Sequence, residues 1–258
     1  ESHKLTLNNI KGHDALINHN NCAYTTLRTV GSKCLSLKQH IQRKYEASQQ
    51  NSCIKIQEDK INQEIRCQLQ ILIQNKPLIN SDELRIYIFF NYETQEISCF
   101  AEKLTISPAV SEFKTMNLVR DNPHVKDNAW VQKRKEAENL LSKDVNEVII
   151  YDEYVTEGLS SNVFIVKDSV LKTAPPEMVL VGTMRQQVIQ ACKQLNLTVL
   201  EQQFTLEELM EADEVFVCST SRYVVCGQKV NEVQKEISIG KRIRHILEKQ
   251  IQSNGEDV

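Results

Sequence analysis

The sequence predicts a mixed α+β or α/β protein built from two modest domains. The chain has 258 residues, a length that allows one large domain or two smaller ones. Strand-like and helix-like patterns alternate up to about Leu104 and complete a small unit near Pro108, and a second mixed set follows residue 123. We therefore expect an N-terminal α+β domain at 1–108, a linker at 109–122 and a larger C-terminal domain at 123–258.

The N-terminal domain combines strands with two helical segments. Residues 23–30 alternate in polarity and are rich in β-branched side chains, which is typical of a strand. The remaining elements expected here are a helix over 38–48, one long helix or a broken pair over 54–75, and a hairpin of strands at 84–92 and 96–104.

The C-terminal domain is expected to hold more strands. They fall at 147–151, 163–166, 170–173, 198–200 and 214–218, with helices at about 129–142, after Gly182, from Thr205 and over 240–252. The helix at Thr205 has a capping box, because Thr205 can accept a hydrogen bond from the backbone of Glu208 and the Glu208 carboxylate can return one.

Composition excludes several classes of function. The chain carries 31 basic and 34 acidic residues and a net charge of −3, so nucleic acid and anionic membranes are unlikely partners. It has no apolar run of about 18 residues that could cross a membrane. The eight cysteines show no Cys/His spacing typical of a metal site, so we expect reduced thiols in the cytoplasm or mitochondrial matrix and no bound metal.

The chain is organised around residues 147–187. An apolar strand leads to Glu157, and a polar loop and a second apolar strand follow, so the carboxylate is expected to lie between two strands. Soon afterwards Gly182 opens an amphipathic helix whose first N–H groups can bind an anion. An acid and an anion cradle together indicate a ligand with a basic nitrogen and a phosphate.

These residues resemble the class IV (fold-type IV) pyridoxal phosphate (PLP) enzymes. This family includes branched-chain and D-amino-acid aminotransferases and 4-amino-4-deoxychorismate lyase. The resemblance covers nearly the whole chain and rests on five blocks in order: 23–28 with 40–43, 156–164, 181–185, 211–216 and 219–220. It implies the two-domain D-amino-acid aminotransferase-like fold, with the cofactor bound by the C-terminal domain.

The resemblance also implies a role for each matching residue. Lys126 would form the Schiff base with the cofactor and carry the proton during catalysis, and Glu157 would pair with the pyridine nitrogen. Arg43 would clamp the phosphate with its fork of donors. The other implied cofactor contacts are Asn162 of the signature, the backbone of Thr183 and Met184 at the helix start, and the hydroxyl of Thr220.

The chain departs from the family at substrate-facing positions. Branched-chain enzymes carry a Tyr five residues after the lysine, where this chain has Val131, and the lyase also lacks that Tyr. The Arg-Gly turn that supplies a substrate-carboxylate arginine in many members is replaced by residues 89–92, Phe-Phe-Asn-Tyr. The usual Gly-Asp-Gly before the first strand is Asn-Asn-Cys at 20–22. Cofactor binding is therefore better matched than substrate recognition.

Three functions remain open. The first is a class IV transaminase that acts on a small amino acid and a 2-oxo acid. The second, a variant of the first, is a lyase like aminodeoxychorismate lyase. The third is a protein with little or no activity that keeps the fold as a structural subunit of a larger complex. By analogy with the family we expect a homodimer.

Overall fold

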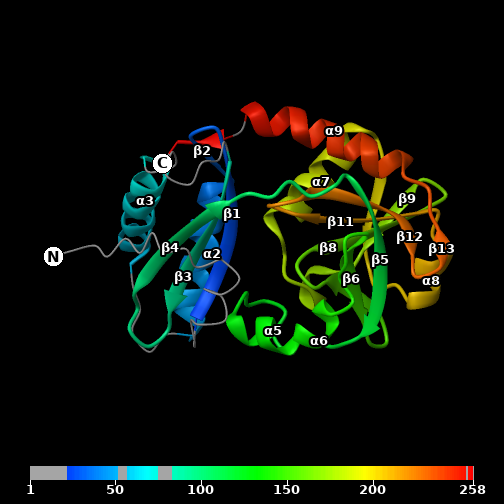
Figure 1. Cartoon of the computed structure of the whole chain (residues 1–258), viewed down its shortest axis with the longest axis horizontal. Helices are drawn as coiled ribbons and strands as arrows, with labels where there is room; N and C mark the ends of the chain where they lie inside the picture. The colour runs from blue at the N-terminus through cyan, green and yellow to red at the C-terminus, as the bar shows by residue number, and fades with distance from the viewer. Residues whose placement is uncertain (1–21, 52–56, 75–82, 254, 258) are drawn as a thin grey trace. The chain divides into compact units, whose positions relative to one another are not determined.

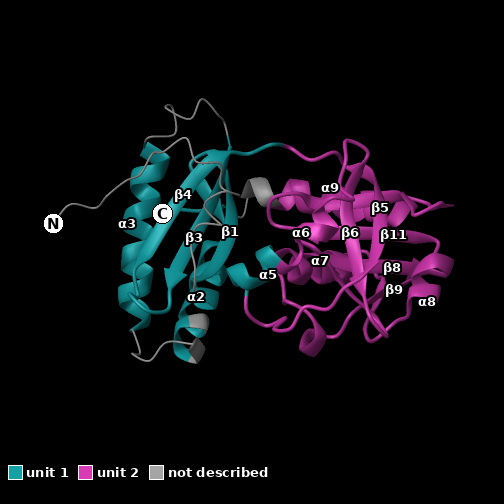
Figure 2. Cartoon of the chain, turned by 60° about the horizontal axis from the view of Figure 1, so that its bottom comes forward, with its two compact units in different colours: residues 1–105, 126–132, 251–258 teal, residues 106–125, 133–250 magenta. Residues whose placement is uncertain are grey.

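The computed structural model describes residues 22–51, 57–74, 83–253 and 255–257 (Figure 1). Several expected features lie outside these ranges, namely the Asn-Asn pair at 20–21, Cys53, and both ends of the segment 54–75. The chain divides into two compact units, coloured separately in Figure 2. Unit 1 comprises residues 1–105, 126–132 and 251–258, and unit 2 comprises residues 106–125 and 133–250.

Unit 1 is an antiparallel sheet with two helices on one face. Its strand order is β14-β2-β1-β3-β4. The strands are β1 (Cys22–Val30), β2 (Lys33–Leu35), β3 (Leu84–Asn91), β4 (Ile97–Lys103) and β14 (Gly255–Glu256), and the helices are α2 (Leu37–Asn51), α3 (Glu58–Gln74) and the short α5 (Asn128–Lys133). Alternate residues of β1 and β3 point to the two faces, so Leu27, Ile86 and Ile88 pack with α2 and α3. Tyr24 and Phe89 form an aromatic cluster on the opposite face.

Unit 2 is built around a ring of strands. The order is β10-β9-β8-β11-β12-β5-β6-β7, and β7 also pairs with β8, which closes the ring; β13 pairs with β12. The strands are β5 (Val110–Asn117), β6 (Val145–Tyr151), β7 (Val155–Gly158), β8 (Asn162–Lys167), β9 (Val170–Thr173), β10 (Thr198–Glu201), β11 (Glu214–Ser219), β12 (Tyr223–Val230) and β13 (Val233–Gln234). The helical segments are α6 (Lys135–Glu138), η1 (Pro176–Met178), α7 (Thr183–Gln194), α8 (Leu206–Glu211) and α9 (Ser238–Ser253).

Apolar side chains from the strands of this ring fill its core. Phe113, Ile149, Val163, Val215 and Val225 are all buried in one cluster, although their strands are far apart in sequence. Burial of several such side chains stabilises the unit by about 1.5–3 kcal/mol each. This core fixes the registers of β7, β8 and β11, the strands from which the candidate site is built.

The structure agrees with most expected elements and corrects others. The capping box of α8 is present, since Thr205 Oγ1 accepts from Glu208 N at 3.2 Å and Glu208 Oε2 accepts from Thr205 N at 2.9 Å. The expected linker at 109–122 is not irregular, because β5 runs through it between β12 and β6. The expected helix at 129–142 is shorter and broken into α5 and α6.

The boundaries of the two units also differ from the expected ones. Residues 106–125 belong to unit 2, whereas Lys126–Gln132 belong to unit 1 because the backbone at this point pairs with β1. Tyr24 N donates to Lys126 O at 2.7 Å, and Ala23 forms an isolated bridge with Asp127. The chain therefore changes unit immediately before Lys126.

Candidate functional site

Glu157 lies within β7, rather than in a turn between strands. Its backbone pairs with Asn162 of β8, and its side chain is only 4% exposed. Arg120 Nη1 lies 3.0 Å from Glu157 Oε1, and Arg120 Nη2 donates to the carbonyl of Val125 at 2.7 Å. A neighbouring guanidinium favours the ionised carboxylate. Unit 2 therefore holds a buried acid paired with a buried guanidinium.

Asn162 connects this acid to the start of α7. The Asn162 amide nitrogen donates to Leu180 O at 2.8 Å, and its Oδ1 lies so close to Gly182 that a Cβ at that position would collide with it. Gly182 is the N-cap of α7, and no side chain caps the helix there. The first N–H groups of α7 lack acceptors within the helix and can serve an anion.

Two hydroxyl groups lie at the same end of α7. Thr183 Oγ1 and Thr220 Oγ1 are 2.9 Å apart, and Thr220 directly follows β11. Met184, the next residue of α7, is buried with 1% exposure. Unit 2 thus combines an acid, an amide, a helix N-terminus and two hydroxyls.

Lys126 is held in unit 1 by β1. Its carbonyl accepts the hydrogen bond from Tyr24 N, and its Nζ lies 5.1 Å from the centre of the Tyr24 ring. An ammonium over an aromatic face gains a cation–π attraction of about 0.5–2 kcal/mol. Asp127 Oδ1 accepts from Trp130 N at 3.2 Å, which caps the helix that follows. The backbone at Lys126 is thereby held by β1, and its ammonium lies over the Tyr24 ring.

Arg43 lies on α2 in a cluster of basic residues in unit 1. His40 Nδ1 is 2.7 Å from Thr25 Oγ1, and both His40 and Lys44 are buried. Burial lowers the pKa of His40 well below its usual value, and the charges of Arg43, Lys126 and Lys44 lower it further. The pKa of Lys44 is lowered by burial first and then by Arg43 and Lys126. Arg43 therefore lies near basic side chains of which two, His40 and Lys44, have pKa values lowered by burial.

The residues predicted from the sequence form two groups, one in each unit. Unit 2 brings together Glu157, Asn162, Thr183, Met184 and Thr220, and unit 1 holds Lys126 and Arg43. Sequence reasoning missed Arg120, the partner of Glu157. Its only signal was its place six residues before Lys126, and the stretch containing it was expected to be a linker.

The departures from the family have local explanations. Val131 carries no hydroxyl, and it is fully buried in the aromatic cluster with Tyr24 and Phe89. Asn91 Oδ1 accepts hydrogen bonds from the backbone of Glu93 and Thr94, at 2.8 and 2.9 Å, and forms the hairpin turn where other members have Arg-Gly.

Comparison with known proteins identifies the family. The sequence matches the family "Amino-transferase class IV" over residues 22–229, and the chain therefore belongs to it. This confirms the expected family, and members of the family use PLP as their cofactor.

The fold resembles solved structures along almost its full length. It matches the branched-chain amino acid aminotransferase of Escherichia coli with a TM-score of 0.77 at 18% identity, covering 98% of this chain and 92% of that one. It matches a candidate 4-amino-4-deoxychorismate lyase from Legionella pneumophila with a TM-score of 0.72 at 17% identity, covering 89% and 91%. These likenesses confirm the predicted two-domain fold.

Sequence similarity to curated proteins is confined to shorter segments. The chain is 42% identical to the D-alanine aminotransferase of Bacillus licheniformis over 79 residues, which are 30% of this chain and 28% of that protein. Across the curated relatives first matched, the chain spans roughly a third of their length.

The donor set of unit 2 fits PLP. The buried Glu157, paired with Arg120, suits a protonated ring nitrogen, and the uncapped start of α7 with the two Thr hydroxyls suits a phosphate. Gly182 adds a steric argument, because a side chain there would displace Asn162 and obstruct the approach to the helix N–H groups.

Within the described residues, no helix is long and apolar enough to cross a membrane.

Proposed function

We propose that this chain is a PLP-dependent transaminase of class IV that acts on a small amino acid and a 2-oxo acid. The observation that supports it best is the link made by Asn162 in unit 2. This residue pairs with Glu157 on one side and packs against Gly182 at the start of α7 on the other. One residue thus joins an acid for a ring nitrogen, through its backbone pairing, to a cradle for a phosphate, through its side chain.

Each residue of unit 2 has a distinct role in the proposal. Glu157 keeps a proton on the pyridine nitrogen, and Arg120 keeps Glu157 ionised and oriented. Thr183, Thr220 and the backbone of Met184 bind the phosphate at the start of α7. The resemblance to the family assigns Arg43 a phosphate-binding role as well, through its fork of donors.

Lys126 attaches the cofactor and transfers the proton. PLP, when bound, supplies an electron sink for the bond broken at the substrate Cα. The Lys126 amine takes the proton from the substrate Cα and returns it at C4′. This transfer requires the amine to lose its charge during the cycle. Arg43 and Lys44 share the basic cluster to which Lys126 contributes.

A PLP-dependent lyase is the second candidate. The buried Val131 supports it, because the position carries no hydroxyl, as in the lyase members of the family. A structural subunit without turnover is the third candidate, supported by the Asn91 turn that stands where a substrate arginine is expected. We also propose a homodimer, on family analogy alone.

Turnover assays distinguish these functions. A panel of amino donors would be tested with pyruvate and 2-oxoglutarate, and aminodeoxychorismate would be tested for pyruvate release. Transamination by the purified protein that is lost in Lys126→Ala supports the proposal, and pyruvate release from aminodeoxychorismate alone supports the lyase. A chain that binds PLP but turns over none of these substrates would support the structural subunit.

A further inference from the structure

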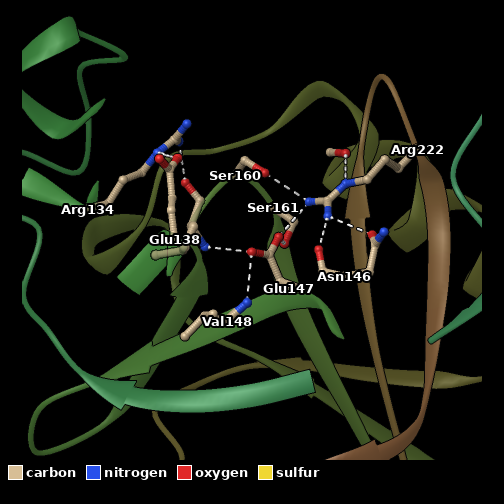
Figure 3. A network of polar contacts seen from close by, with 10 residues as sticks. Arg134, Glu138, Asn146, Glu147, Val148, Ser160, Ser161 and Arg222 are labelled. Carbon is tan, nitrogen blue, oxygen red and sulfur yellow. Dashed lines mark hydrogen bonds and ion pairs between the residues drawn. The ribbon is translucent and has the colours of Figure 1, made fainter. Parts of the chain in front are cut away.

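Glu147 and Arg222 form a buried ion pair that takes no part in the chemistry proposed above. Arg222 Nη2 lies 2.5 Å from Glu147 Oε2, and their side chains are 10% and 1% exposed (Figure 3). Glu147 lies on β6, and Arg222 lies in the turn between β11 and β12. Charges removed from water to this extent need several good hydrogen bonds.

Glu147 receives those bonds from the turn between β7 and β8. Its Oε1 accepts from Leu159 N at 3.1 Å and from Val148 N at 3.1 Å, and its Oε2 accepts from Ser161 Oγ at 2.6 Å. The turn begins at Gly158, where a Cβ would collide with Ser161 Oγ and the Glu147 carboxyl carbon. The residues that flank this turn are Glu157 and Asn162.

Arg222 binds both the turn between β7 and β8 and the turn between β11 and β12, in which it lies. It donates to Ser160 Oγ at 3.0 Å and to the Asn146 carbonyl at 2.9 Å, while its Nε donates to Ser219 Oγ at 3.3 Å (Figure 3). Arg222 N also donates to Ser219 O at 3.3 Å, which closes the turn that contains Thr220. The next residue, Tyr223, is buried with a φ of 60°, an uncommon conformation for a bulky side chain.

We infer that Arg222 and Glu147 are positioning residues for PLP, because one buried ion pair fixes both turns that present its candidate ligands. The first turn sets Glu157 for the ring nitrogen and Asn162 beside the start of α7, and the second sets Thr220 for the phosphate. This inference rests on the proposed use of PLP by this chain. Neither Arg222 nor Glu147 need touch the cofactor for it to hold.

The test uses variants that separate positioning from folding. Arg222→Lys keeps the charge but loses the fork that reaches Glu147, Ser160 and Asn146 together. A double variant, Glu147→Gln with Arg222→Met, removes both charges and so avoids an unpaired buried ion. Thr205→Ala is the matched control, because it removes the helix cap of α8 and destabilises unit 2 without touching either turn.

The measurements are the dissociation constants of PLP and of pyridoxal, which lacks the phosphate, together with the thermal midpoint. In the Arg222→Lys and double variants we expect PLP to bind about tenfold more weakly, a loss of roughly 1.4 kcal/mol. The preference for PLP over pyridoxal should fall, because Thr220 is misplaced. Thr205→Ala should lower the midpoint and leave that preference unchanged.

The outcomes are distinguishable from failure of the proposed function. If the wild-type chain does not bind PLP, the proposed function and this inference both fall. If the wild type binds PLP and the Arg222→Lys and double variants bind it with unchanged affinity and preference, the inference alone is overturned. A double variant that recovers the wild-type midpoint but not the affinity for PLP is the result that supports it most strongly.

Discussion

Replacing Glu157 with Gln should destabilise the cofactor-free protein by about 3–5 kcal/mol, the range for removing one partner of a buried ion pair. The structure places the pair in that range, because Arg120 and Glu157 are 7% and 4% exposed and 3.0 Å apart. The Gln side chain has nearly the same shape but leaves the guanidinium without its counter-charge. Urea unfolding at pH 7 in the absence of PLP measures the difference.

The neighbouring residue offers a matched control for this experiment. Asp121 pairs with Lys133 at 2.7 Å, but the two side chains are 78% and 38% exposed. Exposed pairs contribute about 0–1 kcal/mol, so Asp121→Asn should change the unfolding free energy little. Arg120→Met combined with Glu157→Gln should recover part of the loss, because no unpaired charge remains. Equal, small losses in Glu157→Gln and Asp121→Asn would refute the reasoning.

Three further predictions concern single side chains. Gly182→Ala should cost about 1–3 kcal/mol through the collision with Asn162 Oδ1 and should weaken phosphate binding, measured by unfolding and by competition of inorganic phosphate with PLP. Thr205→Ala should cost about 1 kcal/mol in urea unfolding, because the N-cap of α8 is lost; no change would contradict the capping box. Lys44→Met should stabilise the chain at neutral pH by about 1–3 kcal/mol, the cost of burying a polar group without full compensation. The pKa of Lys44 is lowered from its usual 10.5. Between the lowered pKa and 10.5 the unfolded chain binds the extra proton, so wild-type stability should rise with pH and the advantage of Lys44→Met should shrink as the pH rises toward 10.5; a constant advantage would contradict this.

Local patterns were sufficient to predict most elements, because caps and alternation act over a few residues. They failed at β5, whose partner β12 is distant in sequence, and at β12. Only Ser111 and Phe113 of β5 are buried, and the polar residues around them, such as Glu112 and Lys114, make the strand hard to recognise until its parallel pairing with β6 and β12 is known. In β12, Gly227 interrupts the apolar run, and the structure shows why: a Cβ there would meet the Phe113 ring.

The residues of the candidate site also divide into those that local sequence patterns predict and those that depend on distant contacts. Residues in the family's sequence blocks, such as Glu157 and Gly182, could be predicted from spacing because each block folds locally. Arg120 could not, since its contact with Glu157 depends on β5 being paired in the ring. The pair of Glu147 and Arg222 joins residues 75 positions apart and is likewise visible only after folding.

Covalent binding of PLP by Lys126 is tested by incubating the protein with PLP, reducing it with borohydride and mapping the modified lysine by mass spectrometry. We expect near-complete labelling of Lys126 in the wild type and loss of the label in Lys126→Ala. Labelling of Lys44 instead, or no protected lysine adduct at all, would contradict it.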